Sequence, residues 1–273
     1  MKLKRLFIAS LAVLFISACG SRAYYPSPEE LQERRERLAK AEAMFQERCK
    51  KAGEFIYRTA ENVEGIFILK LRPKDINYRD QYKMDDPYGS DTGGIGYIEN
   101  FLRGRDAKQS LVDQNGVKNG YLYVDAIGPD DGKRYRYTSR MDEPWQRDKS
   151  YEEGYMRFIA DRVPAPDSAP RYGVTYDDIS TREERDYWIA GSSLRVIDLK
   201  TNEVMAERIG YMFDPGQGSD SGGRSPWLSA ASYACPIFRP ANAVRQPDFV
   251  YQMFQTRNFV EKVLHIKQSK KEK

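Results

Sequence analysis

Pairs of neighbouring carboxylates are the side chains in this sequence whose types suit catalysis without a histidine. They occur at Asp85-Asp86, Asp130-Asp131, Glu152-Glu153 and Asp177-Asp178. Two carboxyl groups held several ångströms apart can serve as acid and base in the cleavage of a glycosidic bond. Adjacent residues of a strand point to opposite faces, so the two members of one pair cannot act together on one substrate. A catalytic dyad would therefore combine carboxylates from different segments of the chain.

Two segments repeat an Asp-Pro turn that leads into Gly, Ser and Asp. Residues 86–94 read Asp-Pro-Tyr-Gly-Ser-Asp-Thr-Gly-Gly, and residues 214–223 read Asp-Pro-Gly-Gln-Gly-Ser-Asp-Ser-Gly-Gly. As matching loops at one end of a sheet they could hold Ca²⁺ or a sugar, because glycines let backbone amides approach a ligand. The candidate ligand residues are Asp91, Thr92, Asp220 and Ser221. The alternative is that any long exposed turn contains these residue types, and one repeat does not establish a duplication.

The second of these segments also suggests a nucleophile. Residues 218–223 resemble the Gly-Asp-Ser-Gly-Gly turn of trypsin-like serine proteases, except that a serine separates Gly218 from Asp220. The catalytic triad needs a histidine base. The single histidine, His265, follows the candidate serine, against the order of that family, and falls in a segment expected to be helical. We interpret the match as a coincidence and assign no catalytic residue.

The first eighteen residues have the composition of an export signal. Lys2, Lys4 and Arg5 form a positive n-region, and residues 6–16 form an apolar run of about eleven residues, the length of a signal h-region. This run is too short to span a bilayer, which needs about twenty residues. It ends in Ile16-Ser17-Ala18-Cys19.

These four residues resemble the lipobox of bacterial lipoprotein precursors, in which a branched apolar residue and two small residues precede the cysteine. The resemblance implies that Cys19 receives a diacylglyceryl group, that residues 1–18 are removed, and that the new amino group is acylated. Several acyl chains on one residue give stable membrane anchoring. The alternatives are an ordinary cleaved signal with a chance cysteine and an uncleaved anchor helix. Gly20 replaces the aspartate that signals inner-membrane retention in enterobacteria, which favours the outer membrane, facing the periplasm.

Two cysteines remain for the exported domain, Cys49 and Cys235. An even number in an oxidising compartment predicts a disulfide between them. It would close a loop of nearly the whole domain, for which the chain-entropy model gives roughly 5 kcal/mol as an upper figure. Two separate buried thiols are the alternative. A zinc site is not expected, because the chain has no Cys-x-x-Cys pair and one histidine.

The charge of the chain argues against nucleic acid as a partner. Of its 44 basic residues three lie in residues 1–18, so 41 basic and 40 acidic residues remain, for a net charge near +1. Nucleic-acid binding leaves a strongly basic footprint instead. The basic end of the chain, 267–273, is expected to be a flexible, solvated tail. Contact of this tail with anionic lipid or an acidic partner is the alternative.

The elements that would position these residues begin after a lipidated tether, 19–27. Ser27 is expected to cap a helix that has Pro28 at its first position and acidic residues in its first turn. Apolar residues then recur at helical spacing up to Cys49, and Gly53 ends the helix. This helix should carry Cys49 to its partner.

The middle of the chain is rich in β-branched and aromatic residues, which predicts strands. The predicted strands cover 55–57, 66–71, 121–127, 135–138, 155–163, 188–199 and 204–213. The last two, joined by Lys200-Thr201-Asn202-Glu203, form the clearest hairpin. A second helix begins at Pro247 and has an apolar face that runs to Leu264. We therefore predict one α+β domain, 28–266, in which an N-terminal and a C-terminal helix flank an antiparallel sheet.

The function remains open between two classes. The chain has no cofactor loop, no metal spacing and no well-placed histidine, which favours a non-catalytic lipoprotein that binds another envelope protein. Its 19 tyrosines and three tryptophans, together with its carboxylates, also suit a protein that binds or cleaves peptidoglycan or another glycan. An aromatic-lined groove between two carboxyl groups would favour the second class, and a flat aromatic patch the first.

Overall fold

A computed structural model describes residues 25–90, 92–104, 120–240 and 246–267. The chain divides into two units, Met1–Arg37 and Leu38–Lys273. Helix α1, Pro28–Cys49, begins in the first unit and ends in the second. As expected, Ser27 caps it, since the backbone N–H of Glu30 donates to Ser27 Oγ (3.1 Å) and Glu30 Oε2 accepts from the backbone N–H of Ser27 (2.7 Å). Cys19 lies outside the described residues.

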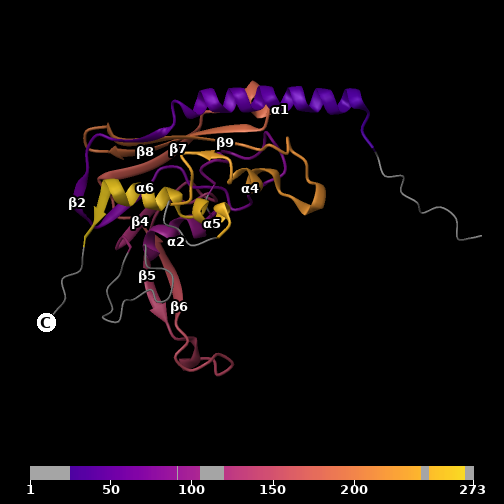
Figure 1. Ribbon diagram of the computed structural model, residues 1–273. Helices are drawn as coiled ribbons and strands as arrows, with labels where there is room; N and C mark the ends of the chain where they lie inside the picture. The colour runs from indigo at the N-terminus through magenta and orange to yellow at the C-terminus, as the bar shows by residue number, and fades with distance from the viewer. Residues whose placement is uncertain (1–24, 91, 105–119, 241–245, 268–273) are drawn as a thin grey trace, which may run out of the picture. The chain divides into compact units, whose positions relative to one another are not determined.

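The second unit is built on a nine-stranded sheet with the order β1-β9-β8-β7-β3-β4-β5-β6, where β10 also pairs with β9 (Figure 1). The strands are β1 Gly53–Ile56, β3 Gly65–Ile68, β4 Tyr123–Ile127, β5 Arg134–Asp142, β6 Arg157–Pro164, β7 Tyr172–Asp178, β8 Ile189–Asp198, β9 Glu203–Phe213 and β10 Ala234–Cys235. The α+β class is confirmed. Strand β7 was not among the predicted strands.

The prediction of a purely antiparallel sheet is wrong, because β3 runs parallel to both β4 and β7. The other pairings in this sheet are antiparallel. Parallel neighbours need a long crossover, and the chain between β3 and β4 supplies one that includes helix α2, Ile95–Arg103. The predicted β8–β9 hairpin is confirmed, with Asp198 opposite Glu203.

The C-terminal helix is present but divided. It consists of α5, Asp248–Gln252, and α6, Gln255–Val263, and the chain then forms strand β11, Leu264–Ile266. Strand β11 pairs in parallel with β2, Ala60–Val63, so His265 lies in a strand and the expectation of a helix there is wrong. The shorter helices are α3 Arg182–Asp186, α4 Pro226–Ala230, and the 3₁₀ turns η1 Pro144–Gln146 and η2 Ser221–Gly223.

Alternation along β8 and β9 buries both faces of the sheet. On one face Leu194 and Ala206 pack with α6, through Phe259, and with the α2 side chains. On the other face Ile189, Tyr211 and Phe213 pack with Ala41 and Phe45 of α1, and the rings of Phe45 and Phe213 are 5.4 Å apart. Within the described ranges, no helix is long and apolar enough to cross a bilayer.

Cys49 at the end of α1 forms a disulfide with Cys235 in β10, and their Cα atoms are 5.5 Å apart. The predicted pairing is confirmed. Because β10 is hydrogen-bonded to the end of β9, the bridge ties α1 to the sheet at β9, next to the edge strand β1. Of the basic tail, only Lys267 is described, and its Nζ lies 2.6 Å from Glu64 Oε1.

Candidate functional site

Every buried carboxylate in the described ranges has an arginine partner. The pairs are Arg72–Asp86, Arg136–Asp125, Arg147–Asp142, Arg48–Glu184, Arg171–Asp198, Arg224–Asp214 and Arg257–Glu261. The hydrogen bond from Arg147 lowers the pKa of Asp142, and the bond from Arg171 lowers the pKa of Asp198 to about 2. A general acid at neutral pH needs a raised carboxyl pKa instead. Asp142 and Asp198 therefore lack the raised pKa of a general acid. In all seven pairs the arginine neutralises a buried carboxylate, whose charge would be costly without a partner.

Four of the eight carboxylates in the acidic pairs singled out in the sequence form ion pairs. Their ion pairs are Lys70–Asp85, Arg72–Asp86, Arg195–Asp177 and Arg185–Asp178. Asp131 accepts a hydrogen bond from the hydroxyl of Tyr135 (2.6 Å), which lowers its pKa. The remaining three, Asp130, Glu152 and Glu153, are exposed and form no ion pair within the described part of the chain. No two of these carboxylates face each other across a described pocket.

The two Asp-Pro segments do lie at the same end of the sheet. Strands β3 and β9 run in the same direction, because β3 is parallel to β7 and two antiparallel pairings separate β7 from β9. The segments that follow them are in contact. Trp227 Nε1 donates to the backbone oxygen of Asp80 (3.1 Å), and Arg79 Nη1 lies 3.5 Å from Asp220 Oδ2.

The first aspartate of each segment organises its own turn. Asp86 Oδ1 accepts from the backbone N–H of Gly89 (3.0 Å). Asp214 accepts from the backbone N–H groups of Gly216 (3.0 Å) and Gly218 (2.9 Å). Both aspartates are fully buried. The similarity of the two motifs therefore has a structural cause, since an aspartate whose side chain accepts from the following backbone amides commonly forms a turn.

The structure places the candidate ligand residues in different surroundings. Asp91 lies outside the described residues. Thr92 Oγ1 accepts from Asn100 Nδ2 (3.0 Å) at the start of α2. Asp220 has a side chain that is 72% exposed, and Ser221 is exposed in η2. Within the described residues, no group of three His, Cys, Asp or Glu side chains could hold a metal ion. Ligand binding by these loops stays a prediction.

His265 has partners of its own on the surface. Its Nδ1 bonds with Glu61, and its Nε2 lies 3.1 Å from the backbone oxygen of Lys262. No hydrogen bond joins it to Ser221 in the described residues. This arrangement supports the interpretation of the Gly-Ser-Asp-Ser motif as a turn and not as a nucleophile.

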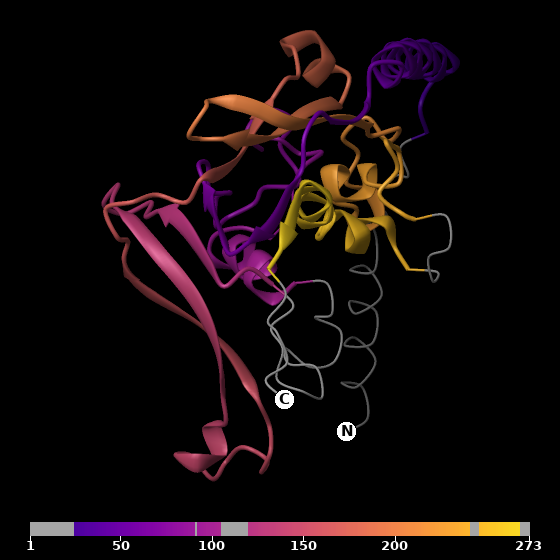
Figure 2. The same cartoon turned by 90° about the vertical axis from the view of Figure 1, so that its left-hand side faces the viewer.

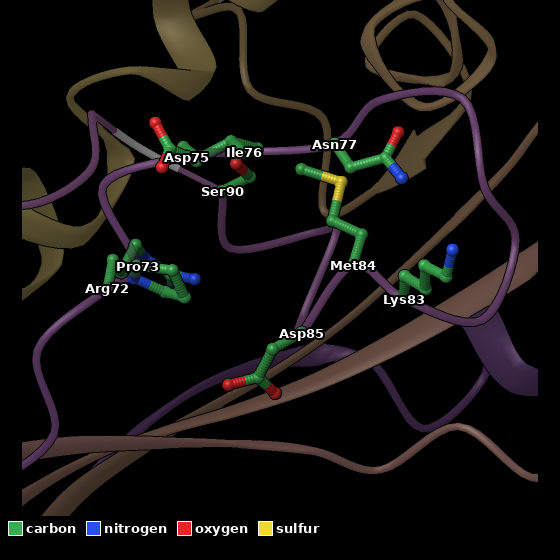
Figure 3. A pocket seen from close by; sticks show the side chains of 9 residues that line it. All are labelled: Arg72, Pro73, Asp75, Ile76, Asn77, Lys83, Met84, Asp85 and Ser90. Carbon is green, nitrogen blue, oxygen red and sulfur yellow. The ribbon is translucent and has the colours of Figure 1, made fainter.

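A small pocket opens in the segment after β3 (Figure 3). It is lined by Arg72, Pro73, Asp75, Ile76, Asn77, Lys83, Met84, Asp85 and Ser90, and its cavity volume is about 50 Å³. A cavity needs about 10–15 Å³ to hold one water, so this pocket holds a few waters or a small chemical group. No aromatic ring lines it. It is therefore not the aromatic-lined groove that a glycan-binding protein would offer.

The most unusual feature of the second unit is a long hairpin, which we call the arm: β5, β6 and the segment 143–156 between them. Strand β4 pairs with β5 only as far as Thr138. Among the described strands, β6 alone pairs with β5 from Ser139 to Asp142. At about 3.4 Å per residue, β5 spans roughly 30 Å. Figures 1 and 2 show the arm leaving the rest of the sheet in both views.

The tip of the arm, residues 143–156, exposes large apolar side chains. Tyr151 is 38% exposed, and Tyr155 and Met156 are each 48% exposed. The rings of Tyr151 and Tyr155 are parallel to within 8°, with centroids 6.0 Å apart. Lys149 Nζ lies 3.2 Å from the centroid of the Trp145 ring, a cation–π contact. Trp, Tyr and Met side chains of this kind are enriched in protein interfaces.

Hydrogen bonds within the tip fix its conformation. Glu143 Oε2 accepts from Gln146 Nε2 (2.6 Å), Glu143 Oε1 accepts from the backbone N–H of Gly154 (2.8 Å), and these bonds lower the pKa of Glu143. Asp142 binds Arg147 (2.5 Å) across the base of the tip. Gly154 has a φ of 80°, a left-handed conformation that favours glycine. These contacts hold the tip in a defined conformation.

Sequence reasoning found both strands of the arm but not the arm itself. The ranges 135–138 and 155–163 were predicted as separate strands, and Tyr135 pairs with Pro164 in the structure. The fourteen residues between the observed strands, 143–156, carry no two-residue turn signature of the kind that predicts a hairpin. The available signal was Pro144 with Gly154, which mark the two ends of the tip.

No protein-family model matches the chain, and no curated protein or solved structure matches it.

Proposed function

We propose that this chain is a non-catalytic binding protein of the bacterial cell envelope. Lipid on Cys19 holds it to the membrane, in the outer membrane on the periplasmic side, and the tip of the arm engages a protein partner. The observation that carries this proposal is the arm, whose preformed tip presents exposed aromatic side chains beyond the sheet.

Support for the envelope comes from two independent features of the chain. Residues 1–18 have the order of a lipoprotein signal, ending at Cys19. Cys49 and Cys235 form a disulfide in the domain that follows, and disulfides persist in oxidising compartments such as the periplasm.

Support for binding over catalysis comes from the carboxylates. Buried carboxylates throughout the described ranges are neutralised by arginine, and those at the sheet end organise turns. The pocket lined by Arg72 and Asp85 has a volume of about 50 Å³, smaller than pockets that bury a substrate. An interface, by contrast, needs only a preformed surface with a few aromatic anchors.

The test is affinity capture from the solubilised envelope of the source bacterium. The bait is residue 21 onward, purified from an oxidising compartment, with bound proteins identified by mass spectrometry. A matched bait replaces residues 143–156 by Asn-Gly, because Asp142 lies opposite Arg157 and a two-residue turn can join such a pair. Both baits should show the same thermal unfolding and the same disulfide.

We expect one protein to be recovered in stoichiometric amount with the full bait and lost with the shortened bait. Recovery of the same protein by both baits would refute the role of the arm. Recovery of peptidoglycan fragments alone would contradict the proposal of a protein partner and indicate a glycan ligand instead.

A further inference from the structure

We infer that the surface which receives the tip of the arm is apolar at its centre and carries arginine at its rim. This inference rests on the proposed function and names the chemistry of the partner. It follows from the charges that stand between the exposed rings of the tip.

Glu152 and Glu153 are the side chains that point to a charged rim. They lie in sequence between Tyr151 and Tyr155, both are exposed, and neither side chain forms a hydrogen bond or ion pair within the described residues. Both carboxylates are therefore available to a partner beside the stacked rings of Tyr151 and Tyr155.

The remaining charges of the tip are engaged internally. Glu143 holds Gln146 and Gly154, Arg147 is paired with Asp142, and Lys149 lies over Trp145. Four acidic and two basic residues fall within 143–156, so the tip has a net charge of −2 on a chain whose net charge is positive. The tip therefore presents a local negative field around apolar rings.

The negative charge of the tip favours a protein surface over a membrane surface as its binding partner. Tyrosine and tryptophan suit a membrane interface as well as a protein interface. Bacterial membranes carry anionic lipids, however, and an anionic surface repels Glu152 and Glu153. A protein surface with complementary positive charge attracts them and speeds association.

Arginine meets both features of the tip at once. Its guanidinium binds carboxylates through two parallel hydrogen bonds, and it stacks on aromatic faces. The parallel rings of Tyr151 and Tyr155 offer such faces next to the two glutamates. Lysine carries a point charge on a flexible stem, so it can pair with the carboxylates but stacks less well on the rings.

The test uses the protein recovered by the arm in the capture experiment, purified and titrated against the chain from residue 21 onward. Glu152→Lys/Glu153→Lys reverses the charge of the tip. Asp130→Lys/Asp167→Lys makes the same change in charge at the root of the arm, where both residues are exposed. Each variant is measured at low and at physiological salt, because salt screens exposed charges.

We expect the tip variant to bind at least about tenfold more weakly and to lose most of its salt dependence, while the root variant binds within about twofold of the parent chain. Equal affinity and salt dependence in the tip variant would overturn the arginine rim and leave the role of the arm intact. If the chain with the shortened arm still bound the same protein with unchanged affinity, the proposed function itself would be refuted.

Vesicles of phosphatidylethanolamine and phosphatidylglycerol test the membrane as the occupant. We expect the unlipidated chain to remain in the supernatant when the vesicles are sedimented. Sedimentation with the vesicles that is lost when residues 143–156 are shortened would overturn the inference, because the tip would then be a membrane-binding element.

Discussion

Cys49 and Cys235 are joined by a disulfide although 186 positions separate them in the sequence. The bridge connects the last residue of α1 to β10, which is hydrogen-bonded to the end of β9. The same residues contact the cluster in which Phe45 of α1 packs on Phe213. The C-terminal end of α1 is thus joined to the sheet both covalently and by apolar packing.

Removal of this bridge should destabilise the domain without changing its fold. In Cys49→Ser/Cys235→Ser we expect the free energy of unfolding to fall by several kcal/mol, with roughly 5 kcal/mol as the upper figure for so long a loop. Urea denaturation followed by circular dichroism measures the difference. The parent chain treated with reductant serves as the control and should match the variant. Equal midpoints for the oxidised and reduced parent would contradict the expectation.

The Asp-Pro turns should respond to mutation as structural elements. Asp214→Asn removes the buried charge that pairs with Arg224 and weakens the hydrogen bonds from the Gly216 and Gly218 amides. We expect the free energy of unfolding to fall by about 3–5 kcal/mol. Asp220→Asn, in the same loop but exposed, should change stability by less than about 0.5 kcal/mol. Chemical denaturation of both variants gives the comparison. A larger effect from Asp220 would show that the loop is organised differently.

Asp198 makes the stability dependent on acid. Hydrogen bonds from Arg171 lower its pKa to about 2, below the value of about 3.9 for an unfolded aspartate. A lowered pKa in the folded state means that this contribution to stability is complete above about pH 4 and disappears as the pH falls towards 2. Unfolding measured between about pH 5 and pH 2 should therefore show a shallower loss in Asp198→Asn than in the parent. Asp161→Asn is the control and should keep the parental slope, because Asp161 is a half-exposed partner of Arg140.

Membrane attachment should depend on one sulfur atom. We expect the precursor to incorporate a palmitate analogue and to fractionate with the outer membrane, and Cys19→Ala to abolish labelling and release the protein from the membrane. Cys49→Ser, which leaves the lipobox unchanged, should still be labelled. Persistent membrane attachment of an unlabelled Cys19→Ala protein would show that the lipid anchor does not exist.

Local sequence signals predicted those parts of the fold that depend on near neighbours. Ser27 followed by Pro28 marked the start of α1, and the alternation of Leu194, Val196 and their polar neighbours marked the β8–β9 hairpin. The direction in which β3 joins the sheet was not predicted, because parallel pairing depends on a crossover through α2. That helix begins after Gly93-Gly94 without a side-chain cap, so no start signal was visible.

In the candidate site, too, the sequence predicted local features but not long-range contacts. The sequence located the two Asp-Pro loops, but the partners of their aspartates and of Asp198 could not be read from it. Arg72 is 14 positions from Asp86, and Arg58 is 140 positions from Asp198. The arm depends on pairing between strands that flank fourteen irregular residues, and the exposure of Tyr151 and Tyr155 depends on where that pairing ends.

Site-specific photocrosslinking in living cells tests the central claim most directly. A photoreactive amino acid replaces Tyr155 at the tip of the arm or, as a control, Tyr233 beside β10, and both tyrosines are 48% exposed. The account predicts that irradiation joins the Tyr155 variant to a single envelope protein and leaves the Tyr233 variant uncrosslinked. The same protein captured from both positions, or no protein captured from Tyr155 in a chain that folds and reaches the membrane, would contradict it.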